Sequence, residues 1–185
     1  MCVVDVTFGL GALNVHVTAG NDTQLADIQL AEALMDTCYE MYRQTTIGLA
    51  PEVTRFQVSE EPFSVSGSAD HNLLRPETIE SLFILYRVTG DDKYVDWGWQ
   101  IFRAFEMHSK WPKGGYTSTS HVAKGPLKRT DKMESFFIAE TLKYLLLLFS
   151  PMEVRHCAPS VFSSIWSLEV SELSLIHISE PTRPY

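Results

Sequence analysis

Two carboxylates and an arginine lie together where a helix is expected to begin. Arg75 is followed by Pro76, and Glu77 and Glu80 are three residues apart, which places both carboxylates on one side of a helix. The free N–H groups of a helix start and a neighbouring guanidinium both stabilise a carboxylate in its charged form. Glu77 would then act as a general base or face a cation, and would not act as a general acid. The alternative is structural, because acidic residues are common in the first turn of any helix.

A second candidate site contains Glu140, which lies among aromatic residues on a helix that is otherwise apolar. Phe137 precedes it by three residues and Tyr144 follows it by four, so the three side chains share one face. A buried, unpaired carboxylate is unfavourable, and Glu140 should therefore meet a hydroxyl, an arginine or a cation. Sugar sites are often built in this way, with the ring packed on C–H faces and the carboxylate bound to hydroxyls. A paired glutamate inside a helix bundle is an equally good explanation of these residues alone.

Other recognisable catalytic motifs are absent from the sequence. No glycine-rich phosphate loop follows a strand, and neither GxSxG nor HExxH occurs. The histidines are scattered, and Cys2, Cys38 and Cys157 form neither a CxxC pair nor a zinc-ligand spacing. Since an odd number of cysteines suits a disulfide framework badly, we expect free, buried thiols.

The composition is that of an acidic globular chain. The 185 residues include 15 Lys and Arg against 23 Asp and Glu, for a formal net charge of −8, which excludes a broad basic surface for nucleic acid. No apolar run approaches the roughly 20 residues of a membrane span. No Lys or Arg precedes Arg43, so no signal peptide or anchor can be recognised. Either the protein is cytosolic or its targeting segment lies outside this chain.

The elements that must position the carboxylates are mainly helices. Apolar residues recur at steps of three and four from Leu25 to about Gln44, and again after Pro76, where Gly90 should cap the helix end. Asp91 and Asp92 can cap a third helix that runs to about Phe105. The fourth helix is expected from about Asp131 to Phe149.

The segments between these helices are expected to be loops. Residues 53–74 should form a loop with a β-like piece at 53–58, and residues 110–130 form a loop rich in Lys, Gly, Ser and Thr. Alternating short and long loops suit stacked antiparallel helix hairpins. The sequence therefore predicts an all-α fold.

Several of these segments resemble the class I α-1,2-mannosidases, glycoside hydrolase family 47. The resemblance is carried by LLRPETIESLFILYRVTGDDKYVDWGWQIF at 73–102, by the GGY at 114–116, by DKMESFF at 131–137 and by ETLKY at 140–144. GLAPE at 48–52 resembles the family's GLSPE, and the DKMESFF form looks more like the endoplasmic-reticulum branch than the Golgi branch.

The resemblance implies a fold, an activity and a cofactor. The fold would be an (α/α)7 barrel, a toroid of helix hairpins. The activity would be removal of α-1,2-linked mannose from high-mannose N-glycans with inversion at the anomeric carbon. The cofactor would be one Ca²⁺, and the parent protein would work in the endoplasmic reticulum or elsewhere in the secretory pathway.

The resemblance also implies roles for single residues. Glu77 corresponds to the base-side catalytic carboxylate. Glu77 and Glu140 would hold Ca²⁺ through water, whereas the threonine that binds it directly in the family has no counterpart here. The residues expected to bind substrate are Arg75, Phe137, Glu140, Glu52 and Glu80.

The chain departs from the family in length and at both ends. Seven hairpins of about 35 residues need about 245 residues, so we interpret 25–149 as a C-terminal part of an incomplete barrel. Residues 1–24 diverge, and the expected disulfide partner of Cys38 is not matched there. Residues 151–185 do not resemble the family and are expected to be a foreign, poorly packed tail.

These departures remove the acid-side glutamate, so this chain by itself is expected to be inactive. The alternatives are binding of mannose glycans without cleavage and a truncated homologue with no function.

Overall fold

The computed structural model describes residues 21–56, 63–65, 69–123 and 126–150, with the side chains described from residue 26 onward. Residues up to Phe149 belong to one compact unit, and a second unit begins at Ser150. All the elements described below belong to the first unit. The segments 1–20 and 151–185, for which we predicted a divergent start and a foreign tail, lie outside the described residues.

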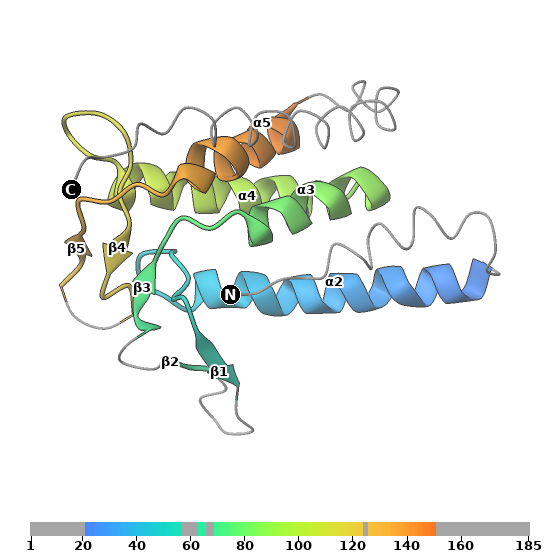
Figure 1. Ribbon diagram of the computed structural model, residues 1–185. Coiled ribbons are helices and arrows are strands. Elements are labelled where there is room, and N and C mark those ends of the chain that lie inside the picture. Colours follow the sequence, from blue (N-terminus) through green and yellow to red (C-terminus); the bar gives the residue numbers. More distant parts are fainter. Residues whose placement is uncertain (1–20, 57–62, 66–68, 124–125, 151–185) are drawn as a thin grey trace, which may run out of the picture. The chain divides into compact units, whose positions relative to one another are not determined.

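In the part of this unit that the structure describes, four α-helices contribute most of the residues, as the periodicity predicts. Helix α3 packs against each of the other three, and Figure 1 shows α3, α4 and α5 side by side above α2. Because α3 is covered on several sides, apolar side chains surround most of its circumference. The helices are α2 (Asn21–Arg43), α3 (Glu77–Thr89), α4 (Lys93–Ala104) and α5 (Lys143–Phe149).

The short link between α3 and α4 follows from its residue types. Gly90 has a φ of +73°, a conformation that glycine adopts without strain, and its N–H donates to the Tyr86 carbonyl at 2.9 Å. Asp91 Oδ1 then accepts the Lys93 N–H at 2.9 Å. Asp92 forms no side-chain cap, so of the two aspartates that we predicted as caps only Asp91 is one.

The predicted start of the last helix at Asp131 is wrong, because the helix begins at Ser135. The preceding residues are held in extended form: the Lys132 carbonyl accepts the Ser118 N–H, and the Ser118 carbonyl accepts the Thr130 N–H, both at 2.9 Å. These carbonyls and N–H groups are thus engaged outside a helix. The helix itself opens as a π-helical turn, η4 (Phe137–Leu142), and a similar turn, η3 (Phe105–Ser109), extends α4.

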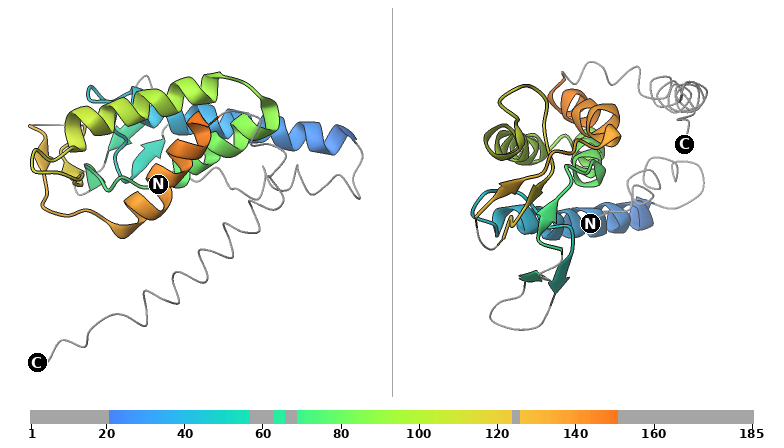
Figure 2. Two further views of the ribbon diagram at one scale, coloured as in Figure 1. Left: turned by 90° about the horizontal axis from the view of Figure 1, so that it is seen from above. Right: turned by 60° about the vertical axis from the view of Figure 1, so that its left-hand side comes forward.

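Short strands join the loops at one end of the helices (Figure 2). Strands β1 (Thr54–Phe56) and β2 (Phe63–Val65) form an antiparallel hairpin, which agrees with the β-like piece predicted at 53–58. Strands β3 (His71–Asn72), β4 (Thr119–Ser120) and β5 (Lys128–Arg129) form an antiparallel sheet in that order. The prediction that 110–130 contains only loop is therefore wrong, and this sheet ties that segment to the residues before α3.

Cys38 is buried, as expected, but it is disulfide-bonded and not a free thiol. The described residues contain no second cysteine. Among the helices of the described ranges, none has the length and apolarity to cross a membrane.

Candidate functional site

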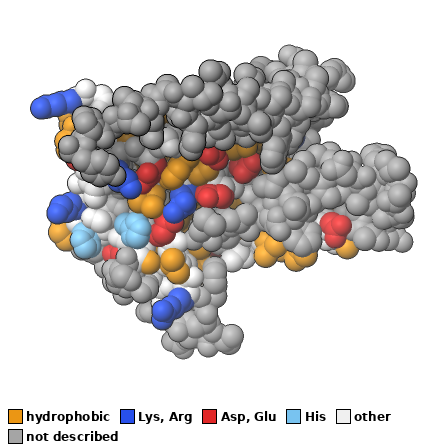
Figure 3. Space-filling model, viewed as in Figure 1, with side chains coloured by type: hydrophobic (Ala, Val, Ile, Leu, Met, Phe, Trp, Pro, Cys, Tyr) orange, Lys and Arg blue, Asp and Glu red, His pale blue; other side chains and the backbone are white. Residues whose placement is uncertain are grey.

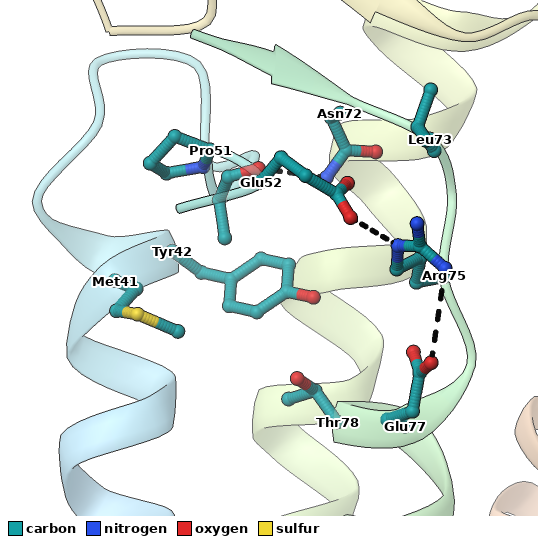
Figure 4. Close-up of a pocket in the computed structure, with 10 residues that line it drawn as sticks. Met41, Tyr42, Pro51, Glu52, Asn72, Leu73, Arg75, Glu77 and Thr78 are labelled. Atoms are coloured by element: carbon teal, nitrogen blue, oxygen red, sulfur yellow. Dashed lines mark hydrogen bonds and ion pairs between the residues drawn. The ribbon is translucent and has the colours of Figure 1, made fainter. Parts of the chain in front are cut away.

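A pocket lies where the C-terminal end of α2 meets the first turn of α3 (Figure 4). On the face shown in Figure 3, acidic and basic side chains lie next to apolar ones near the middle of the molecule. The pocket is lined by Met41, Tyr42, Ala50, Pro51, Glu52, Asn72, Leu73, Arg75, Glu77 and Thr78.

Backbone hydrogen bonds fix the loop that carries Glu52. The Glu52 N–H donates to the Ala69 carbonyl at 3.1 Å and to the His71 carbonyl at 2.8 Å. The Asn72 side-chain amide donates to the Ala50 carbonyl at 2.8 Å. The loop 48–52 is therefore joined to the segment that leads into α3, although about twenty residues separate the two in sequence.

Leu74 turns the chain sharply just before Arg75. It is fully buried and has a φ of +62°, which costs about 1–3 kcal/mol in a residue other than glycine. Two hydrogen bonds hold this conformation: the Leu74 N–H donates to Asn72 Oδ1 at 2.9 Å, and Thr141 Oγ1 donates to the Leu74 carbonyl at 2.7 Å. The turn directs Arg75 toward the pocket.

Arg75 joins three of its neighbours. Its Nε donates to Glu52 Oε1, and its Nη1 lies 4.0 Å from Glu77 Oε1. Its guanidinium carbon is 5.7 Å from the centre of the Phe136 ring. The guanidinium thus places one positive charge between two carboxylates and beside an aromatic face.

Glu77 is the first residue of α3, as predicted. Its Oε2 atom is buried and has no hydrogen-bond partner among the described residues. Leaving a buried acceptor unsatisfied costs on the order of 1–3 kcal/mol. A carboxylate oxygen in this setting is suited to a water, a substrate hydroxyl or a cation.

Tyr42 brings a neutral phenol to the same pocket. Burial raises the pKa of Tyr42 to about 12; a hydrogen bond with Thr78 opposes the shift, and the negative charges of Glu77 and Glu52 add to it. The phenol therefore keeps its proton near neutral pH. Tyr42 was not predicted as a site residue, because its only signal in the sequence is its place on the buried stripe of the first helix.

Glu140 lies on the π-helical turn η4 and is half-buried. The next residue, Thr141, donates to the Leu74 carbonyl, and η4 packs against α3. The element that bears Glu140 is thus tied to the turn that directs Arg75. Such π-helical turns occur frequently at functional sites.

The two adjacent phenylalanines, Phe136 and Phe137, have different surroundings. Phe137, predicted to bind substrate, is 1% exposed and packs on Phe105 and Tyr116, with ring centres 6.1 and 4.8 Å away. Phe136 is half-buried and lies beside Arg75. Both precede Glu140 at helical spacing, so the spacing could not distinguish them.

The remaining predicted residue, Glu80, lies one turn after Glu77. Its Oε1 accepts the Tyr144 hydroxyl at 2.6 Å, a contact that joins α3 to α5. In the ranges that the structure describes, no group of three or more His, Cys, Asp and Glu side chains could hold a metal directly.

Residues 2–164 match a family model described as Glycosyl hydrolase family 47. The chain belongs to glycosyl hydrolase family 47. The matched range extends at both ends beyond residues 25–149, over which the motifs carry the resemblance. At its C-terminal end it reaches residue 164, inside the segment predicted to be foreign.

Two relatives align with the same part of the chain. The chain is 54% identical over 129 residues to the endoplasmic reticulum mannosyl-oligosaccharide 1,2-alpha-mannosidase of Homo sapiens, with 66% of this chain and 18% of the relative covered. It is 49% identical over 172 residues to the Rattus norvegicus protein of that name, with 86% and 25% covered. The chain thus spans a quarter or less of these relatives.

A solved member of the family shows the same fold. The alpha-1,2-mannosidase from Trichoderma reesei superposes with a TM-score of 0.63 at 30% identity, and the match covers 80% of this chain and 33% of that one. The helices described here therefore form part of the α/α barrel of family 47, as predicted.

Proposed function

We propose that this chain supplies the base-side part of the active site of an inverting α-1,2-mannosidase that trims high-mannose N-glycans. One observation carries the proposal: Glu77 stands at the start of α3 beside Arg75, with one carboxylate oxygen buried in the pocket and unpartnered among the described residues. Membership of family 47 and the activity named for its relatives support the reaction class.

Glu77 would act as the general base. Inverting hydrolysis uses two carboxyl groups roughly 6.5–9.5 Å apart, one to activate water and one to protonate the leaving oxygen. Glu77 would take a proton from the water that attacks the anomeric carbon. The acid on the other side of the sugar is not assigned to any residue of this chain.

Arg75 and its neighbours would hold the sugar. The guanidinium and the carboxylates of Glu52 and Glu140 suit hydroxyl groups, with Glu80 supporting them from the next turn of α3. We place the ring that packs on the sugar at Phe136, because Phe137 has no exposed face on which a sugar could lie.

The residues present fit the Ca²⁺ that the family implies. The buried and unpartnered oxygen of Glu77 is a hard donor of the kind that Ca²⁺ and its waters prefer. Glu77 and Glu140 would hold the ion through waters. When bound, the ion would supply positive charge that orients water and sugar hydroxyls. The names of the relatives support the endoplasmic reticulum or secretory pathway as the place of action.

The second candidate is binding of mannose glycans without cleavage. It is favoured by the assignment of only one catalytic carboxylate, because the groups around Arg75 can hold a sugar without an acid.

The test is to incubate the chain with a high-mannose N-glycan and Ca²⁺ and to measure free mannose. Release of β-mannose, abolished by Glu77→Gln, supports the hydrolase. Absence of release, together with retention on a mannan column that Arg75→Ala abolishes, supports binding alone. If the chain neither releases mannose nor is retained, both proposals fail.

A further inference from the structure

The GGY segment at 114–116 has no task in the proposed reaction, although the structure gives it a defined shape. Gly114 and Gly115 have φ angles of +109° and +79°, which other residues adopt only with strain. Two backbone hydrogen bonds of 2.9 and 3.0 Å close the turn that these glycines complete. Lys110 and Tyr116 then pair across the turn in an antiparallel bridge. The glycines thus return the chain so that Tyr116 lies beside the end of η3.

The hydroxyl of Tyr116 is fixed by a carboxylate. It donates to Glu106 Oε1, and the other carboxylate oxygen of Glu106 accepts Lys110 Nζ at 2.6 Å. The hydrogen bond from Lys110, and then the one from Tyr116, lower the pKa of Glu106, so this acceptor is charged near neutral pH. Hydrogen bonds to a charged group are stronger than those between neutral groups. Because Glu106 is the second residue of η3, the phenol of Tyr116 is joined to that turn.

The ring of Tyr116 contacts η4. Its centre is 4.8 Å from that of Phe137, and the two planes are inclined at 47°. Phe105 meets the same ring edge-on, with centres 6.1 Å apart and planes at 86°. Since Phe105 and Glu106 are neighbours in η3, both contacts of Phe137 lead from one π-helical turn to the other.

The turn that is held in this way carries two of the groups proposed to bind the sugar. Phe137 is buried and is the first residue of η4. Phe136 directly precedes it and lies beside Arg75, and Glu140 follows three residues later on the same turn. Fixing the ring of Phe137 therefore fixes the backbone from which Phe136 and Glu140 project.

We propose that Tyr116 is a positioning residue for η4. Through its hydrogen bond to Glu106 and its contact with Phe137, it holds the turn that presents Phe136 and Glu140 to the sugar. The effect on sugar binding rests on the function proposed above, whereas the hold on η4 does not.

The first experiment measures amide hydrogen exchange by NMR in this chain, with the amides of α2 as the reference. We expect Tyr116→Phe to speed exchange of the η4 amides about 2- to 10-fold relative to α2, the range expected for one lost hydrogen bond. Tyr116→Leu, which also removes the ring contact, should speed it further. Tyr39→Phe is the matched control, because the Tyr39 hydroxyl likewise donates to a side chain, Gln100 Oε1 at 2.7 Å, but joins α2 to α4.

The second experiment titrates the chain with α-1,2-mannobiose in the presence of Ca²⁺. We expect Tyr116→Phe to weaken binding about 2- to 10-fold, in line with the looser turn. In a Phe136→Ala background the same change should have a smaller effect, because one of the groups that Tyr116 positions is then absent. Tyr39→Phe should bind as the unmodified chain does.

The two experiments separate the possible failures. Unchanged η4 exchange in Tyr116→Phe, or an equal rise in η4 and α2, overturns the positioning role, because a residue that only stabilises the fold affects both helices alike. An equal loss of binding with and without Phe136 also counts against it. If the unmodified chain does not bind α-1,2-mannobiose, the proposed function fails, whereas the exchange rates still decide whether Tyr116 holds η4.

Discussion

Glu77 owes its properties to three local features. It opens a helix, it lies near an arginine that also binds Glu52, and one of its oxygens is buried without a partner among the described residues. Arg75 places a positive charge near one oxygen, whereas the buried oxygen leaves an open place for water or a ligand. These features together suit a base.

In an intact homologue that carries these motifs, we expect Glu77→Gln to lower kcat on the order of 10²–10⁴-fold while KM changes little, because the amide keeps the shape of the side chain but cannot take a proton from water. Steady-state kinetics at saturating Ca²⁺ measure this. Glu40→Gln, which breaks a surface pair with Arg43, serves as the control. A near-normal kcat in Glu77→Gln would leave Glu77 as a simple helix-start carboxylate.

The neighbouring phenylalanines should respond differently to substitution. Phe137→Ala removes a ring from the core and should lower the free energy of unfolding by about 3–5 kcal/mol. Phe136→Ala should cost about 1 kcal/mol, mainly from its contact with Arg75, but should weaken binding of mannosides. Urea unfolding and mannoside titration measure the two effects. Equal losses of stability would contradict the different burial of the two rings.

At the scale of elements, the site depends on how α3, η4 and α5 are joined. Thr141 ties η4 to the Leu74 turn, Tyr144 ties α5 to Glu80, and Arg87 donates to the Leu147 carbonyl at 2.7 Å. These contacts link residues 60 or more positions apart. The element bearing Glu140 is thereby held against the one bearing Glu77.

The contact between α4 and α5 depends on a glycine. A Cβ at Gly98 would lie 2.3 Å from Leu148 Cδ2, and Leu148 is almost fully buried. Overpacking costs about 1–3 kcal/mol, against a gain of about 1 kcal/mol from replacing glycine inside a helix.

We therefore expect Gly98→Ala to lower the free energy of unfolding by about 1 kcal/mol, as measured in urea. In a Leu148→Ala background the same change should be neutral or stabilising, because the space is then open. A loss that is equal in both backgrounds would exclude the clash as its cause.

At the scale of the whole molecule, packing between remote segments changes how the fold responds to pH. His108 lies on η3, and its backbone carbonyl accepts the Nε–H of Arg129 from β5 at 2.7 Å. Burial, and then the Arg129 charge, lower the pKa of His108 below its ordinary value of 6.5. The unfolded chain therefore takes up this proton more readily than the folded one.

Protonation of His108 at low pH should therefore destabilise the folded state. The contribution of a neutral His108 is fully present above about pH 6.5, and it is lost as the pH falls below that value. We expect the urea midpoint to drop between pH 7.5 and pH 5.5, and to drop less in His108→Gln. Identical pH slopes in the two proteins would show that His108 does not contribute.

Some of this molecule follows from the order of residues alone. The 3.6-residue period locates the four helices, Gly90 marks an end, and Pro76 with two acidic residues marks a start, because each of these signals acts within a few residues of its own position. The motifs around Glu77 were enough to predict the family and the α/α fold.

Tertiary structure decided the features that depend on contacts between distant residues. Phe136 and Phe137 precede Glu140 by four and three residues, so spacing allows either to lie beside it. Only packing buries Phe137 and leaves Phe136 beside Arg75. The delayed start of the last helix comes from hydrogen bonds between Ser118 and residues 130–132. The pairing of Tyr42 with Thr78 joins side chains of two different helices. A local pattern determines which face of a helix carries a side chain. The residue that this side chain contacts is determined by the packing of the whole fold, in which buried polar groups need hydrogen-bond partners.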